Sequence, residues 1–306
     1  MTYWESAFAI PVEQRVGVAA REVVIYLNLD NIQNGYPNKP QAVAIPGDFL
    51  KDVNDAFAEL PPTVKQLIAN KLAGIQFVRD LGGTGFTEYI LDRASRPAAG
   101  FIVLDVDVLA KQTANAWATW KENTPFKPDA GFRLEAEIEA KGQDNRKNAI
   151  QYILLHELGH VASIGAAIHP RWDQPPGKNS TLAGYPFAQL SWRITGKDNR
   201  YASLFDASFP QRRNVVYYFG AKLAGNRMVS VYERLEHTNF PTLYAATRPG
   251  DDFAETFASY VHTVLLKRPL EIRLYRDGGI AKTYRSCWDE QRCAEKRKLL
   301  EEFLKP

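Results

Sequence analysis

The amino-acid sequence predicts an α+β fold, with a mixed sheet first, one long helix near the middle of the chain, and a mostly helical second half. Two observations support this prediction. Short apolar runs bounded by Gly and Pro dominate the first third of the chain, whereas apolar residues recur at helical spacing in the rest. With 306 residues, 45% of them hydrophobic and 24% charged, the chain can bury a sizeable core as one large domain or two.

Local signals predict the first elements. Residues 21–30 contain the run Val-Val-Ile-Tyr-Leu and are expected to form a strand, whereas residues 37–40, bounded by prolines, are expected to form a loop. Pro61 and Pro62 favour the start of a short helix, which Gly74 is expected to close.

More strands are predicted around a glycine cluster. Residues 75–79 and 86–91 have strand-like composition and flank residues 82–85, Gly-Gly-Thr-Gly, which are expected to form a hairpin turn. This cluster lacks the lysine and the spacing of a phosphate-binding loop. Residues 101–109 predict a further strand, with the two acids of Leu-Asp-Val-Asp-Val on one face.

Residues 156–160, His-Glu-Leu-Gly-His, are the most informative run in the chain. Apolar residues recur around this run at three- and four-residue spacing, which predicts a buried stripe on a helix of about five turns. Asp144 or Asn145 can cap the start of that helix, and Gly165 offers a natural end.

The spacing of this run is that of metal ligands. His156 and His160 are four residues apart and share one face of a helix, so both imidazoles can point at one site. Glu157 follows the first histidine and can hold a water bound there, which is what zinc-assisted peptide hydrolysis requires. A core helix with two hydrogen-bonded histidines is the alternative, but such polar groups are costly to bury without a metal or partners.

A catalytic zinc site needs a third protein ligand. A third histidine six residues after His160 is one common arrangement, but Ala166 occupies that position. His169 follows the predicted end of the helix and could ligate only from a loop. We therefore expect His169 to be a solvated loop residue.

A later segment can supply the missing ligand. A helix is predicted to begin at Pro249, because Asp251 and Asp252 favour the positive end of the helix dipole. The expected packing face contains Phe253, Phe257, Val261 and Val264. Asp251, Glu255 and His262 lie on another face, and His262 is expected at the surface or supporting the site. An ordinary acidic helix start is the alternative.

These two segments together resemble the gluzincin metallopeptidases. The resemblance rests on residues 156–160 and on the later pairing of Tyr-Ala-Ala-Thr at residues 244–247 with Asp-Asp-Phe-Ala-Glu at residues 251–255. The motifs are most similar to those of anthrax lethal factor-type and Mlc titration factor A-type peptidases and of uncharacterised bacterial zinc-peptidase-like proteins. The resemblance covers the two motif helices and little else.

The resemblance implies a zincin-like fold, a Zn²⁺ cofactor and roles for three further residues. Asp251 matches the third ligand, Glu255 a supporting carboxylate, and Tyr244 a tyrosine that we expect to stabilise the oxyanion. The family's usual ligand is glutamate, which is one methylene longer than aspartate. Either Asp251 ligates, or Glu255 does, and the other acid orients a ligand histidine. A packing role is the alternative for Tyr244.

The motifs and the resemblance predict a zinc-dependent metallopeptidase acting on a peptide or protein substrate. Glu157 is the expected general base for a zinc-activated water. Residues 101–109 are expected to be a sheet edge to which the substrate adds as a strand. A peptide- or partner-binding protein on an inactive zincin scaffold and an amidase acting on cell-wall peptide are the alternative functions.

Charge and hydropathy exclude two classes of partner. The net charge of +3 is too small to indicate nucleic-acid binding, and Lys296-Arg297-Lys298 is expected to be a solvated helix face. No apolar run approaches the ~20 residues of a membrane span. The sequence does not indicate an oligomeric state.

The two cysteines bear on the compartment. Cys287 and Cys293 are six residues apart, which allows a small-loop disulfide and favours a periplasmic or secreted protein. The first residues lack the pattern of a signal peptide, so this prediction requires a leader that has been removed. Two free thiols in a cytoplasmic protein are the alternative.

The predicted organisation has two regions within one catalytic unit. Residues 1–165 contain the sheet and the motif helix. Residues 166–306 are expected to be mostly helical, carrying the third ligand and an aromatic-rich segment that forms a cleft wall. Within this second region residues 171–185 are expected to be a loop, and residues 282–306 are expected to end in a charged helix docked on the body.

Overall fold

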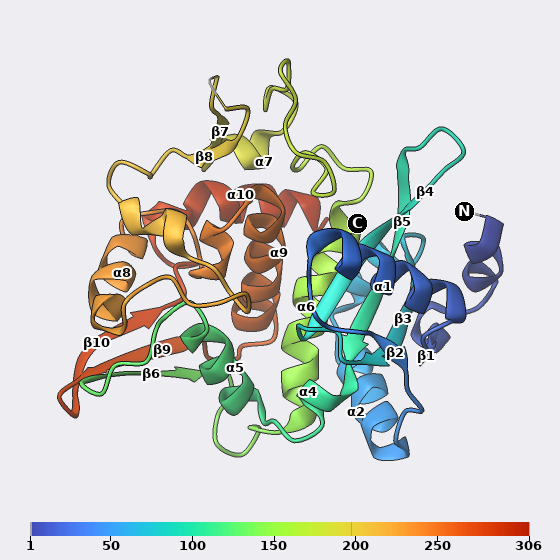
Figure 1. The fold of residues 1–306 in the computed structure, drawn as a ribbon, viewed down its shortest axis with the longest axis horizontal. Coiled ribbons are helices and arrows are strands. Elements are labelled where there is room, and N and C mark those ends of the chain that lie inside the picture. The colour runs from blue at the N-terminus through green and yellow to red at the C-terminus, as the bar shows by residue number, and fades with distance from the viewer. Residues whose placement is uncertain (1, 197, 306) are drawn as a thin grey trace. The chain divides into compact units, whose positions relative to one another are not determined.

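The structure, a computed structural model, describes residues 2–196 and 198–305 and divides into two compact units (Figure 1). The first unit contains residues up to 114 together with residues 143–165, and the second contains residues 115–142 and 166–305. Residues 115–142, expected with the first region, belong to the second unit because strand β6 (Phe132–Glu137) pairs with β9 (Glu271–Arg276).

The first unit contains a mixed sheet, as predicted. Its strands lie in the order β1 (Val16–Val18), β3 (Leu72–Arg79), β5 (Pro97–Asp105) and β4 (Gly85–Leu91), and β2 (Gln41–Ala42) also pairs with β3. β3 is parallel to β1 and β5, whereas β4 is antiparallel to β5. The sheet order therefore ends at β4, next to the buried strand β5.

This strand order corrects two predictions. Residues 82–85 do not form a hairpin turn, because β5 lies between the two strands that they connect. Residues 101–109 are not one edge strand. β5 is internal and ends at Asp105, whose carboxylate accepts hydrogen bonds from the Leu81 amide at 2.8 Å and the Val108 amide at 3.0 Å. The second of these bonds caps the short helix α4 (Val106–Leu109).

Residues 21–30 form a helix and not the predicted strand. α1 (Arg21–Asn34) ends at Gly35, which adopts the left-handed conformation with φ 72°. Val23 and Leu27 pack in one buried cluster with side chains of β3 and β5, including Phe101. Tertiary packing thus overrides the strand propensity of the Val-Val-Ile-Tyr-Leu run.

The motif helix covers the other face of the sheet. α6 (Arg146–Ser163) is capped by Asn145, which accepts a hydrogen bond from the Asn148 amide at 3.0 Å, as predicted. It packs on α2 (Gly47–Ala58) and on β4 and β5. Gly100 of β5 permits a close approach, since a Cβ there would lie 2.8 Å from Ile164.

The remaining elements of the first unit are short. The helix predicted to begin at Pro61 and Pro62 is α3 (Pro62–Ile68), and Gly74 does not close it but lies in β3. The unit also contains the 3₁₀ segments η1 (Thr2–Ala9) and η2 (Val12–Gln14).

The second unit combines helices with two small antiparallel sheets, so the prediction of a mostly helical second half is incomplete. One sheet has the order β10 (Gly279–Arg285), β9, β6, and the other pairs β7 (Trp192–Ile194) with β8 (Tyr201–Ser203). The α-helices are α5 (Ala114–Asn123), α7 (Pro186–Gln189), α8 (Met228–Leu235), α9 (Pro249–Tyr260) and α10 (Ala294–Phe303). The shorter helical segments are η3 (Pro210–Asn214), η4 (Gly225–Arg227), η5 (Tyr244–Ala246), the π-helical η6 (Val261–Leu265) and η7 (Gln291–Cys293). Together the two units confirm a mixed fold of helices and strands.

Two predictions about the end of the chain are confirmed. Cys287 and Cys293 form a disulfide, with their Cα atoms 5.8 Å apart. The helix α10 follows directly and docks on α9, with Leu300 fully buried. Among the described residues, no helix has both the length and the hydropathy needed to cross a bilayer.

A buried ion pair joins α10 to α9, and it corrects the prediction of a solvated Lys296. Lys296 donates to Asp252, both side chains are 0% exposed, and Trp192 Nε1 donates to the same carboxylate at 2.9 Å. Burial raises the pKa of Asp252 against the opposing effect of Lys296, and burial lowers the pKa of Lys296. Each charge thus depends on the other to offset its desolvation.

We predict that Lys296→Met destabilises the protein by about 3 kcal/mol or more, because it leaves the Asp252 carboxylate buried without its cation. Lys298→Met, at an exposed position of the same helix, should change the free energy of unfolding by less than about 0.5 kcal/mol. Urea denaturation of the two variants measures the difference. Equal stabilities would contradict the assignment of this pair as a structural contact.

Candidate metal centre

Helix α6 carries the first half of the centre, within the first unit. The imidazoles of His156 and His160 are 8% and 9% exposed, and their ring centroids are 5.0 Å apart. All residues from Asn148 to Ser163 are buried, so the two rings belong to a buried helix. The i, i+4 spacing therefore places two imidazole rings side by side, as the sequence predicts.

Strand β4 holds the carboxylate of Glu157. Thr87 Oγ1 donates to Glu157 Oε2 at 2.5 Å in a buried hydrogen bond. Gly85 of the same strand leaves room for the carboxylate, since a Cβ at this position would lie 2.8 Å from Glu157 Oε1. The Thr87 hydroxyl and the small Gly85 thus both contribute to the position of the Glu157 carboxylate.

Helix α9 carries the second half, within the second unit. It begins at Pro249, as predicted, and all of its residues are buried. Arg248 Nε donates to Asp251 Oδ2 at 2.7 Å, and the Thr247 hydroxyl lies 2.9 Å from the same oxygen. The Arg248 side chain is 59% exposed whereas Asp251 is buried, so the cation beside Asp251 reaches solvent.

Glu255 has different surroundings one turn later. Lys121 Nζ donates to Glu255 Oε1 at 3.0 Å, and Thr242 Oγ1 donates to Glu255 Oε2 at 2.7 Å. Lys121 and Glu255 are both almost fully buried, and Lys121 also lies 3.4 Å from Glu122. Glu255 is therefore part of a buried charge network.

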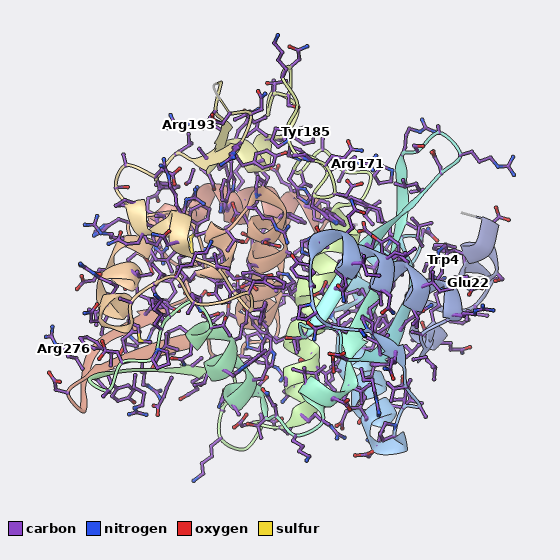
Figure 2. All side chains as sticks on the ribbon, viewed as in Figure 1. Trp4, Glu22, Arg171, Tyr185, Arg193 and Arg276 are labelled. Atoms are coloured by element: carbon purple, nitrogen blue, oxygen red, sulfur yellow. A yellow bond between two sulfur atoms is a disulfide. The ribbon has the colours of Figure 1, made fainter. Side chains whose placement is uncertain are left out.

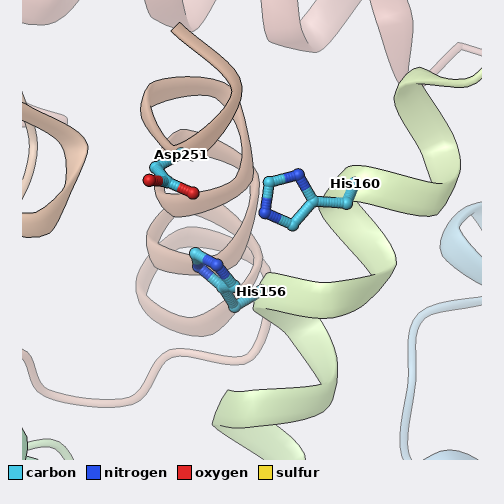
Figure 3. Close-up of side chains that lie close together, drawn as sticks. All are labelled: His156, His160 and Asp251. Carbon is cyan, nitrogen blue, oxygen red and sulfur yellow. The ribbon is translucent and has the colours of Figure 1, made fainter. Parts of the chain in front are cut away.

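Three side chains form a group that could hold a metal ion. His156, His160 and Asp251 each offer one ligand atom, and these atoms all lie within 4.8 Å of one another (Figure 3). Two imidazole nitrogens and one carboxylate oxygen are a donor set suited to a divalent transition metal. Of the two acids that the sequence left open as the third ligand, Asp251 belongs to this group.

Two of the other candidate residues, Tyr244 and His169, are not part of this group. Tyr244 lies in η5 with its ring centroid 4.6 Å from that of Tyr217 and 4.8 Å from Lys121 Nζ, and its role in catalysis stays a prediction. His169 is buried, with its Nδ1 2.7 Å from the Pro170 carbonyl, so the expectation of a solvated histidine was wrong.

His262 has a structural position. It is 1% exposed, which rules out a surface role, and its Nε2 lies 2.8 Å from the Ile138 carbonyl and 3.1 Å from that of Pro269. Burial lowers the pKa of His262 to about 4. The ring is therefore neutral at physiological pH and links η6 to the segments before and after it.

Several residues of the centre could not be recognised in the sequence. Thr87 and Gly85 lie about seventy residues before Glu157, and Lys121 lies 134 residues before Glu255. Their types are common in strands and helices, and no local pattern marks them. Arg248 and Thr247 lie three and four residues before the predicted acid, and among these residues only they had a positional signal.

No match was found when the chain was compared with known protein families, with curated proteins or with solved structures.

We predict that Asp251 contributes to metal affinity and that Glu255 does not. Asp251→Asn should weaken Zn²⁺ binding by more than the roughly 10–100-fold that loss of an outer hydrogen-bonding partner costs. Glu255→Gln keeps an oxygen for Thr242 and should leave the affinity within that range. Competition with a chromogenic zinc chelator measures both dissociation constants, and the reverse order would assign Glu255 as the ligand.

Proposed function

We propose that the protein is a zinc-dependent metallopeptidase that hydrolyses peptide bonds. One observation supports this most strongly: Glu157, whose carboxylate accepts a hydrogen bond from Thr87, lies in sequence between two histidines of a group that could hold a metal ion. A structural metal site has no need for such a carboxylate, whereas hydrolysis needs a base beside the attacking water.

The donor set fits zinc in a catalytic role. Structural zinc sites use four protein ligands, whereas catalytic sites use three and keep one position for water or substrate. The group contains three such side chains, His156, His160 and Asp251, among the residues that the structure describes. Zinc bound by these residues would supply Lewis-acid polarisation of the scissile carbonyl and activation of water.

The residues of the chain itself supply proton transfer and positioning. Glu157 accepts the proton of the attacking water and returns it to the leaving amine. Thr87, which donates to Glu157 Oε2 at 2.5 Å, keeps the other carboxylate oxygen directed for that transfer. Arg248 and Thr247 orient Asp251 through its Oδ2 atom. Tyr244 is the proposed donor to the developing oxyanion.

Strand β4 replaces residues 101–109 as the proposed binding edge for the substrate. It is the last strand in the sheet order, and it carries the hydroxyl that holds Glu157. A peptide added along this strand would gain main-chain hydrogen bonds close to the proposed base.

A peptide-library digest tests the proposal. The protein is loaded with one equivalent of Zn²⁺ and incubated with the library, and Glu157→Gln serves as the matched control because it keeps size and hydrogen bonding. Cleavage by the wild type that falls by about 10²–10⁴-fold in the variant supports the peptidase. Zinc binding without cleavage of any peptide would favour the inactive-scaffold alternative, and cleavage confined to cell-wall peptides would favour the amidase.

A second prediction concerns Gly85. Gly85→Ala places a Cβ 2.8 Å from the present position of Glu157 Oε1 and should displace the carboxylate. We expect kcat to fall about 10²-fold with little change in KM or zinc content. Gly83→Ala is the control, because a Cβ there meets nothing within 4 Å. Equal kcat values for the two variants would refute a role for Gly85 in positioning Glu157.

A further inference from the structure

The second unit contains a polar pocket whose arginines have no role in the proposed chemistry. It has a volume of about 400 Å³, within the roughly 300–1,000 Å³ typical of ligand sites. Its walls come from the β7–β8 hairpin, from η3 and from Thr247. Figure 2 labels Arg193, which lies on that hairpin. The residues that matter for its chemistry are Arg200, Arg212, Arg213, Asp206, Asp198 and Thr247.

The charges of the pocket leave an excess of arginine. Asp206 accepts from Arg212 Nε at 2.5 Å and lies 3.5 Å from Arg213. Burial acts to raise the pKa of Asp206, but the hydrogen bond and charge of Arg212 prevail and lower it, so this acid is ionised and paired. Among the described residues of the lining, three arginines thus face two aspartates, the second of which is the exposed Asp198.

The arginines differ in their freedom to bind a ligand. Arg212 is buried and also donates to the Ala246 carbonyl at 2.8 Å, so it is a fixed part of the wall. The Arg213 side chain is 67% exposed, and Arg200 is also exposed. Two guanidinium groups can therefore reorient toward an incoming anion, and their planar geometry matches a carboxylate.

The pocket shares a residue with the candidate metal centre. Thr247 lines the pocket, and its hydroxyl lies 2.9 Å from Asp251 Oδ2. A group bound in the pocket is therefore only one side chain away from the proposed ligand. Thr247 therefore connects the pocket with Asp251 within the second unit.

We propose that this pocket binds a carboxylate of the peptide substrate, either an acidic side chain or the chain end, through Arg200 and Arg213. That the carboxylate belongs to a substrate rests on the proposed peptidase function; the binding of a carboxylate does not. The peptidase would accordingly select peptides with an acidic residue, or an acidic terminus, near the cleaved bond.

Fluorescence anisotropy with labelled peptides tests the proposal on zinc-loaded Glu157→Gln protein. One set of amidated peptides carries a single glutamate at each position in turn, a second set carries glutamine instead, and a third is the glutamine set with a free C-terminal acid. We expect an acid to be preferred about tenfold or more at one position, as for charge-assisted hydrogen bonds. A preference limited to the third set would identify the chain end as the bound carboxylate.

Two variants and one control connect the preference to the pocket. Arg213→Gln and Arg200→Gln should each reduce the preference several-fold, whereas Arg193→Gln, exposed on the same hairpin outside the pocket lining, should keep it. Equal binding of acidic and amide peptides by the parent protein, or an unchanged preference in both pocket variants, would overturn the proposal. If the wild type hydrolyses peptides but no acid is preferred, only the proposal of carboxylate binding in the pocket is refuted. If an acid is preferred but the wild type hydrolyses no peptide, only the proposed peptidase function is refuted.

Discussion

Burial of ionisable side chains on one helix is the constraint on which the site depends. Residues 148–163 of α6 are all buried, and the helix packs on α2, β4 and β5, so the polar side chains of His156, Glu157 and His160 lose contact with water. Glu157 has the Thr87 hydroxyl. We propose that the two imidazoles share a metal with Asp251, which would also give the adjacent carboxylate a function.

Helix α9 solves a related electrostatic problem, since it buries three acids within five residues and pairs each with a different cation. Asp252 is bound by Lys296 and Glu255 by Lys121, and both lysines are almost fully buried. Asp251 is paired with Arg248, whose side chain is 59% exposed. A cation that reaches solvent can move away at little cost. Asp251 is therefore the acid best able to exchange part of its pairing for a metal, although it is shorter than Glu255.

The sequence predicts the parts of the molecule that local patterns determine. Helical spacing with Asn145 as a cap located α6, and Pro249 located α9, because caps and periodicity act over a few residues. Residues 21–30 were misread because β-branched residues can form a helix when the sheet covers one side. The glycine cluster was misread because strand order depends on distant pairing. Thr87, Gly85 and the buried lysines act on partners far along the chain, which no local signal reveals.

The central claim is that both imidazoles of α6 and one carboxylate bind a single zinc ion. Zinc K-edge X-ray absorption on the protein with one equivalent of Zn²⁺ tests it most directly. We expect four light ligands at about 2.0–2.2 Å, with the outer-shell scattering of two imidazoles. A spectrum with no imidazole scattering, or with six oxygen ligands, would show that the histidines of the His-Glu-Leu-Gly-His run do not bind the zinc ion.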